Sequence, residues 1–134
     1  MPAMNTRSQQ PVVMIVASHP ILRNAILESL LLMQPDWVHL EAKSVAHALQ
    51  LAASSVIDLA LVDANLANAD STDVVRQIRS MAPKTHVVIM TDADFDLAPT
   101  LYMDAGAIAT VRKRNLFAEL GQLLPTLFAT GIAS

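Results

Sequence analysis

The stretch Asp58-Leu59-Ala60-Leu61-Val62-Asp63 is a short apolar run that lies between two aspartates. It is too short for a helix, and the polar, turn-forming segment 65–71 follows it, so it predicts a buried parallel strand. In an open sheet of parallel strands, ligands bind at the edge where the strands end. Asp63 is therefore the candidate for a nucleophile or a metal ligand at that edge.

Three other short apolar runs and one weakly alternating segment, 37–42, lie between amphipathic segments along the rest of the chain, and the alternating one is expected near an edge of the sheet. Strands are expected at 12–16, 37–42, 85–90 and 107–111, in addition to the central run. Helices are expected at 21–33, 45–53, 72–81, 97–104 and 115–128. Five strands that alternate with five helices predict a doubly wound parallel sheet, and right-handed crossovers make it a three-layer α/β/α sandwich.

The caps and inner faces of these helices can also be read from the sequence. Ser44 is expected to cap the second helix, Ser71 or Thr72 the third, and Asn115 the last. Apolar residues recur at helical spacing in the first helix and in the third, which predicts a buried face on each. These residues are Ile21, Leu22, Ala25, Ile26, Leu30 and Met33 in the first helix, and Val74, Val75, Ile78 and Met81 in the third.

The composition excludes several classes of site. The chain has 134 residues, a formal charge of −3 and no cysteine, which excludes disulfides, cysteine nucleophiles and thiolate zinc sites and agrees with a reducing cytoplasm. The mild negative charge argues against a nucleic-acid-binding surface, and the apolar runs are too short to span a membrane. With three glycines and neither G-x-G-x-x-G nor a P-loop pattern, a glycine-rich phosphate loop is excluded.

The organisation along the chain is simple, because no internal repeat or linker divides it. We expect residues 1–11 to be a flexible N-terminus without the features of a signal peptide. Residues 12–129 form one domain of ordinary size, and residues 130–134 form a C-terminal tail.

Three residues at strand ends carry a resemblance to a known family. Asp63 ends the central strand, Thr91 ends the next one, and Lys113 follows the last. With the opening Ile15-Val16-Ala17-Ser18-His19-Pro20-Ile21-Leu22-Arg23, Asp70 in the loop and Ala105-Gly106-Ala107 before the last strand, the chain resembles the receiver domain of two-component response regulators over about residues 12–128. The resemblance implies a flavodoxin-like (βα)5 fold with strand order 2-1-3-4-5 and a signalling module that is not an enzyme.

The resemblance also implies roles for individual residues. Asp63 would be the phosphoacceptor, because a carboxylate at a strand end can attack a phosphoryl group and form an acyl phosphate. Lys113 would pair with Asp63 and then with a phosphate oxygen, and Thr91 would donate its hydroxyl to the phosphoryl group. Asp63 and the backbone carbonyl of Asn65 would be ligands of a magnesium ion.

The chain lacks the two acids that hold magnesium in this family, at the end of the first strand. Ala17 and Ser18 occupy those positions, and no Asp or Glu occurs before Arg23. Magnesium is usually bound by one or two carboxylates with waters and substrate phosphates, so Asp63 alone predicts a weak or unoccupied site. Without the cation, the charge of a transferring phosphoryl group has only Lys113 and the backbone to stabilise it. We therefore expect weak or absent phosphorylation at Asp63.

Three further positions depart from the family pattern. Thr110 stands where an inward-turning aromatic residue is usual, and Tyr102 on the preceding helix does not replace it by position. Asp92 follows Thr91 where a small residue is preferred, so it either opposes phosphate binding or restores a cation ligand. Asn68 replaces the usual turn residues after the central strand and keeps the turn, because it tolerates a left-handed backbone.

Three functions compete on these observations. The first is an atypical receiver that acts through protein–protein contacts, with a sensor kinase or other signalling protein as partner and a possible homodimer through residues 97–128. The second is a working receiver whose cation site uses Asp92 or Asp94. The third is a small flavodoxin-like phosphohydrolase, which needs a second carboxylate such as Asp92 for acid–base work or metal binding. The Asp63–Lys113 pair is also open to a purely structural interpretation.

Overall fold

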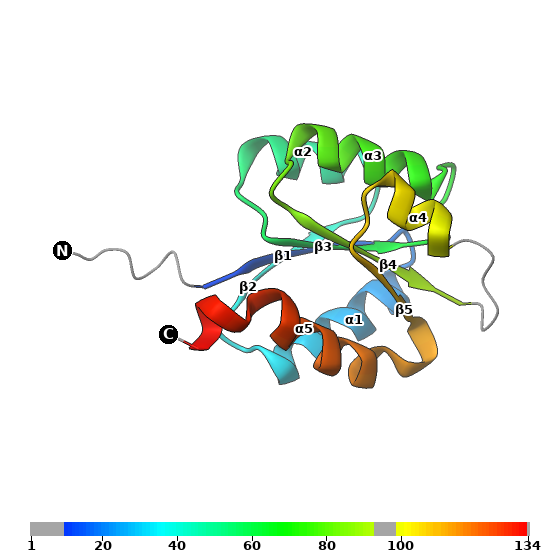
Figure 1. Ribbon diagram of the computed structural model, residues 1–134. Helices are drawn as coiled ribbons and strands as arrows, with labels where there is room; N and C mark the ends of the chain where they lie inside the picture. Colours follow the sequence, from blue (N-terminus) through cyan, green and yellow to red (C-terminus); the bar gives the residue numbers. More distant parts are fainter. Residues whose placement is uncertain (1–9, 93–98, 134) are drawn as a thin grey trace.

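Strand β3 (Leu59–Asp63) lies at the centre of a five-stranded parallel sheet with the order β2-β1-β3-β4-β5 (Figure 1). The computed structural model describes residues 10–92 and 99–133. Its elements are β1 (Val12–Val16), α1 (Pro20–Met33), β2 (Val38–Ala42), α2 (Val45–Ser54), β3, α3 (Ser71–Met81), β4 (His86–Thr91), α4 (Pro99–Ala105), β5 (Ala109–Arg112), the 3-10 turn η2 (Lys113–Asn115) and α5 (Leu116–Ala133). The predicted flavodoxin-like order is confirmed.

Helices cover both faces of the sheet, with α2, α3 and α4 on one side and α1 and α5 on the other (Figure 1). The side chains of each strand alternate between the two layers, as the two-residue period of a strand requires. In β3, Ala60 and Val62 pack toward α2 and α3, whereas Leu59 and Leu61 pack toward α1 and α5. All five residues of β3 are buried, which explains why the sequence of this strand is a continuous apolar run.

Two helix details differ from the sequence prediction. Asp70, not Ser71 or Thr72, caps α3, and its carboxylate accepts the backbone N–H of Thr72 at 3.0 Å. Ile21 is 86% exposed although its spacing places it on the apolar side of α1. Ile26 and Leu30 are the fully buried residues of that helix, and Leu22, Leu27 and Met33 are partly buried against the same layer of the core.

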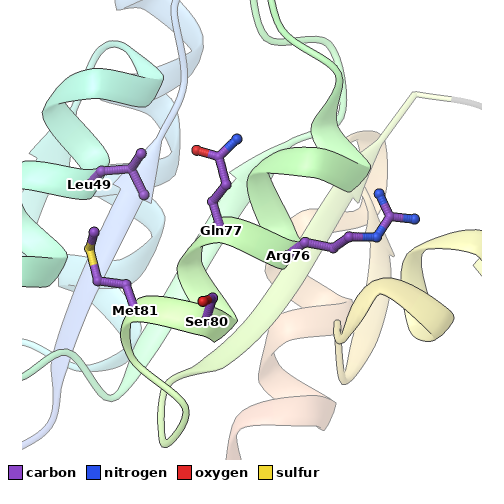
Figure 2. A pocket seen from close by; sticks show the side chains of 5 residues that line it. All are labelled: Leu49, Arg76, Gln77, Ser80 and Met81. Atoms are coloured by element: carbon purple, nitrogen blue, oxygen red, sulfur yellow. The ribbon is translucent and has the colours of Figure 1, made fainter.

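The inner face of α3 ends one turn earlier than its apolar pattern suggests. Val74, Val75 and Ile78 are buried, but Met81 is 47% exposed. Met81 and Leu49 instead line a surface groove between α2 and α3, together with polar side chains of α3 (Figure 2). Periodicity alone does not separate a buried methionine from one at the rim of the core.

The carboxyl-terminal helix is longer than predicted. Asn115 belongs to the 3-10 turn that leads into α5, so the chain is already helical there and Asn115 is not the cap. The helix kinks at Phe128, near its expected end, and then continues to Ala133 through the segment expected as a tail. The ring of Phe128 packs edge-on against Trp37 and His86, with centroids 5.1 and 5.9 Å away.

Several smaller predictions are confirmed. Ser44 caps α2 by accepting the backbone N–H of His47, and β2 lies at one edge of the sheet. Asn68 has a φ of +58°, the left-handed turn conformation expected for it. As a separate observation, which is not among these confirmed predictions, no helix in the described part of the chain is long and apolar enough to cross a bilayer. The flexible N-terminus predicted for residues 1–11 lies mostly outside the described residues.

Candidate functional site

Three parallel strands bring the predicted site residues to one edge of the sheet. Asp63 ends β3, Thr91 ends β4, and Lys113 follows the last residue of β5. The register places Asp63 beside Met90 and Thr91 beside Arg112, so the three residues lie at neighbouring positions on the same edge. Residues that are far apart in the sequence therefore form one cluster, as the pattern of strand ends predicted.

Asp63 is paired and closed off from solvent. Its side chain is 0% exposed, and Oδ1 lies 2.6 Å from Nζ of Lys113, which is 14% exposed. The same oxygen accepts the backbone N–H of Asn65 at 2.9 Å. Oδ2 is buried and has no hydrogen-bond partner among the described residues. A charge-assisted pair of this length stabilises both ions, since each would otherwise be costly to bury.

Asp92 belongs to the same cluster. One of its carboxylate oxygens lies 3.3 Å from Nζ of Lys113, and the other accepts the side-chain N–H of Asn65 at 2.7 Å. The side chain is 64% exposed, so solvent screens it more than it screens Asp63. Lys113 thus faces two carboxylates, and the three charged groups carry a formal charge of −1.

Thr91 reaches the correct edge but turns its hydroxyl elsewhere. The residue is buried, and Oγ1 donates to the carbonyl of Val111 on β5 over a long 3.5 Å. Within the described part of the chain, no hydrogen bond joins this hydroxyl to Asp63 or Lys113. In this arrangement Thr91 is bound to the neighbouring strand and not to the charged cluster.

The end of β1 is closed by backbone groups, the hydroxyl of Ser18 and the guanidinium of Arg23. The backbone N–H of Ala17 donates to the carbonyl of Ala42, and its carbonyl accepts Nη1 of Arg23 at 2.9 Å. Arg23 also pairs with Glu41 at 3.2 Å. The hydroxyl of Ser18 accepts the backbone N–H of Ala67 at 3.1 Å and so ties the loop after β3 to the end of β1.

The roles of Arg23 and Ser18 were missed by sequence reasoning. Both residues lie in the stretch after β1 that carries the family resemblance, but their partners come from β2 and from the loop after β3. A signal did exist, since Arg23 is the first charged residue after β1 and begins no basic run. The sequence does not show which acid or carbonyl it meets.

The oxygens at this edge do not fit a firmly held magnesium ion. The buried, unpartnered Oδ2 of Asp63 is one suitable ligand. Both oxygens of Asp92 already have donors, and the end of β1 supplies no carboxylate. Among the described residues, no group of three His, Cys, Asp or Glu side chains could hold a metal ion. One carboxylate oxygen and carbonyls leave too little negative charge for a magnesium ion, which is usually held by one or two carboxylates.

Tyr102 and Thr110, the two positions compared with the family's aromatic residue, lie on α4 and β5. Tyr102 of α4 is buried, and its hydroxyl accepts the hydroxyl of Ser71 at 3.2 Å, so it joins α4 to the start of α3. Thr110 is half-buried on β5.

The side-chain and backbone hydrogen bonds from Thr72 hold the pKa of Asp70 below its ordinary value, as expected for a helix-capping carboxylate.

Comparisons with known proteins agree on one family. The model of the response regulator receiver domain matches residues 13–124. The chain is 32% identical over 110 residues to a Pseudomonas aeruginosa protein provisionally named a transcriptional regulator, over 81% of this chain and 52% of that protein. It is also 32% identical over 95 residues to the nitrate/nitrite response regulator NarP of Escherichia coli, over 71% of this chain and 44% of NarP. The chain thus spans about half the length of these relatives.

A solved structure shows the same fold. A response regulator from Thermotoga maritima superimposes with a TM-score of 0.77 at 22% identity, over 90% of this chain and 98% of the other. At this identity the likeness shows the arrangement of strands and helices and says nothing about the charged cluster.

Proposed function

Since this chain belongs to the family of response regulator receiver domains, we propose that it is an atypical receiver with little or no magnesium-dependent phosphorylation at Asp63. Receiver domains are in general signalling modules of two-component systems and not enzymes. In this proposal Asp63, Thr91 and Lys113 form a remnant phosphoacceptor site, with Asp63 and the Asn65 carbonyl as a weak magnesium site. The domain acts by contact with a sensor kinase or another signalling protein.

One observation carries this proposal: a buried Asp63 is neutralised by Lys113 while the end of β1 offers no acid. Phosphoryl transfer depends on positioning and on stabilising negative charge at the reacting group, a task that metal ions usually perform. Here Lys113 is the cation at the cluster, and it is shared between Asp63 and Asp92. An incoming phosphoryl group therefore meets a cluster whose formal charge is already −1.

Accessibility supports the same conclusion. The Asp63 side chain has no exposed surface, so a phosphodonor reaches it only after Lys113 or the neighbouring loops move. Breaking a buried ion pair is costly because it leaves one charge without its partner. The pair therefore favours the closed, unmodified arrangement.

The working receiver and the phosphohydrolase both depend on Asp92 as a second carboxylate. Its position favours them, because it lies 3.3 Å from the lysine that also binds Asp63. Its hydrogen bonding weighs against them, since both oxygens already accept or pair with donors. Asp94, the other acid considered for a cation site, lies outside the described residues. A turnover screen with p-nitrophenyl phosphate tests the hydrolase directly.

The working surface in this proposal is the face formed by α4, β5 and α5. Apolar side chains on or beside these elements are exposed, namely Leu101, Met103, Ile108 and Phe117. Arg112 of β5 is exposed as well. Exposed apolar side chains together with a cation on these elements suit a second copy of the chain or an acidic partner.

The decisive experiment is labelling with acetyl phosphate in millimolar magnesium, followed by intact mass measurement. We expect little or no phosphorylation of the wild type. The variant Ser18→Asp, which places a carboxylate at the end of β1, should gain labelling, and Ser18→Asn is its uncharged control. Adding Asp63→Asn to Ser18→Asp should remove any gain. Robust labelling of wild-type Asp63 would overturn the atypical interpretation.

A further inference from the structure

We propose that the Asp92 carboxylate links Lys113 to the loop after β3 and competes with an incoming phosphoryl group for the Lys113 ammonium. We call this link between Lys113, Asp92 and Asn65 the latch. This inference rests on the proposed function, because it names what holds the remnant site closed. It assigns a positioning role to Asp92, whose carboxylate contacts both Lys113 and Asn65.

The contacts of Asp92 join two separate loops. Its Oδ2 accepts Nδ2 of Asn65 at 2.7 Å, and Asn65 also donates its backbone N–H to Asp63. Its Oδ1 pairs with Lys113 at 3.3 Å. The end of β4, the loop after β3 and the end of β5 are therefore connected through one carboxylate.

The position of Lys113 makes this carboxylate a competitor for phosphate. Phosphoryl transfer from acetyl phosphate forms a bond between an Asp63 oxygen and phosphorus, breaks the bond from phosphorus to the acetate oxygen, and releases acetate. Because Nζ of Lys113 lies 2.6 Å from Oδ1 of Asp63, the new phosphoryl oxygens must lie close to Lys113. Oδ1 of Asp92 already lies 3.3 Å from the same ammonium nitrogen, and two anions at one cation repel each other.

The loop after β3 would be tied down by this latch. Its backbone is held at Asn65 by Asp63 and at Ala67 by the Ser18 hydroxyl, and Asp92 adds a third bond through the Asn65 side chain. A segment with several such bonds exchanges its amide hydrogens slowly. Removing the Asp92 side chain should therefore speed amide hydrogen exchange in the loop after β3, although Asp92 is not adjacent to that loop in the sequence.

The plain alternative is an exposed ion pair without consequence. Exposed pairs often contribute nothing measurable, and the Asp92 side chain is 64% exposed. The two interpretations differ in one respect: only a latch changes the exchange of residues 64–68 and the reactivity of Asp63.

Hydrogen exchange of the otherwise unmodified chain tests the latch without any labelling. In Asp92→Ala we expect exchange of residues 64–68 to rise about fivefold, and in Asp92→Asn less, because the amide keeps an acceptor for Asn65. The control Asp36→Ala removes an exposed acid just before β2, at the opposite edge of the sheet, and should leave this segment unchanged. Equal exchange in wild type and Asp92→Ala overturns the latch.

The labelling assay separates this inference from the proposed function. In the Ser18→Asp background, adding Asp92→Asn should raise the rate of Asp63 labelling by about fivefold, with the gain shrinking as salt screens the repulsion. An unchanged rate overturns the competition but leaves the atypical receiver intact. Robust labelling of the wild type overturns the proposed function, whatever Asp92 does. If Ser18→Asp remains unlabelled, the hydrogen-exchange result alone decides whether Asp92 forms the latch.

Discussion

The edge of the sheet at which the strands end has two parts, and they differ in the charged groups that they carry. At the ends of β3, β4 and β5, Asp63, Asp92 and Lys113 form a charged cluster around a buried carboxylate. At the ends of β1 and β2, one backbone hydrogen bond joins Ala17 to Ala42, and the guanidinium of Arg23 binds the Ala17 carbonyl and pairs with Glu41.

The difference separates what the fold requires from what phosphorylation requires. The buried Asp63 carboxylate needs the Lys113 ammonium as its counter-charge. Ala17 and Ser18 at the end of β1 carry no charge, and the sheet forms with them in place. Removal of Lys113 should instead destabilise the domain. The experiments below test this contrast, beginning with the largest effect.

The variant Lys113→Met should destabilise the domain most. It leaves the Asp63 carboxylate buried without a counter-charge, which we expect to lower the free energy of unfolding by about 3 kcal/mol. Urea denaturation measures the change. The matched control is Arg76→Met, which removes an exposed pair with Asp73 at 2.9 Å and should cost about 0.5 kcal/mol or less.

A second variant checks that the Lys113→Met loss comes from the stranded charge. Adding Asp63→Asn to Lys113→Met should recover part of the stability, because a neutral amide is cheaper to bury than a carboxylate. Similar losses for Lys113→Met and Arg76→Met would show that the buried pair is no more important than a surface one.

On the other half of the edge, the variant Arg23→Met should have an intermediate effect. It keeps an apolar stem but removes the bond to the Ala17 carbonyl and the pair with Glu41, at a cost of about 1 kcal/mol. Thermal unfolding measures the loss, with Lys43→Met as an exposed control. A loss as large as that of Lys113→Met would mean that both halves depend on buried charge.

The smallest effect concerns His39 of β2. Burial lowers the pKa of its imidazole below 6.5, so at pH values just below 6.5 the unfolded chain binds more protons than the folded one. The stabilising contribution of the neutral ring is complete above pH 6.5 and is lost as the pH falls through the pKa of the folded state. His39→Gln should flatten this part of the stability profile, whereas the exposed control His19→Gln should not.

Much of the fold follows from local patterns. Four strands follow from short apolar runs, since a strand buried on both faces leaves a nearly continuous hydrophobic stretch. The edge strand β2, which is partly exposed, follows instead from a weak alternation of apolar and polar residues. The helix boundaries were less certain where packing, not periodicity, decides. Met81 and Ile21 have the correct spacing but lack a neighbour to bury them, and α5 continues past a kink where Phe128 packs against Trp37.

The two aspartates that bracket the first quoted stretch show the limit most clearly. By itself, the sequence determined that both flank a buried strand and that one lies at the ligand-binding edge, because alternating strands and helices leave few ways to build a sheet. The family resemblance already implied Lys113 as the partner of Asp63, but only the tertiary structure decided the partner of Asp58 and the contacts that surround each carboxylate. Asp58 accepts the backbone N–H of Val12 at 2.8 Å, whereas Asp63 pairs with Lys113, fifty residues further along the chain. Side-chain partners depend on which strands become neighbours, and that is settled when the whole core packs.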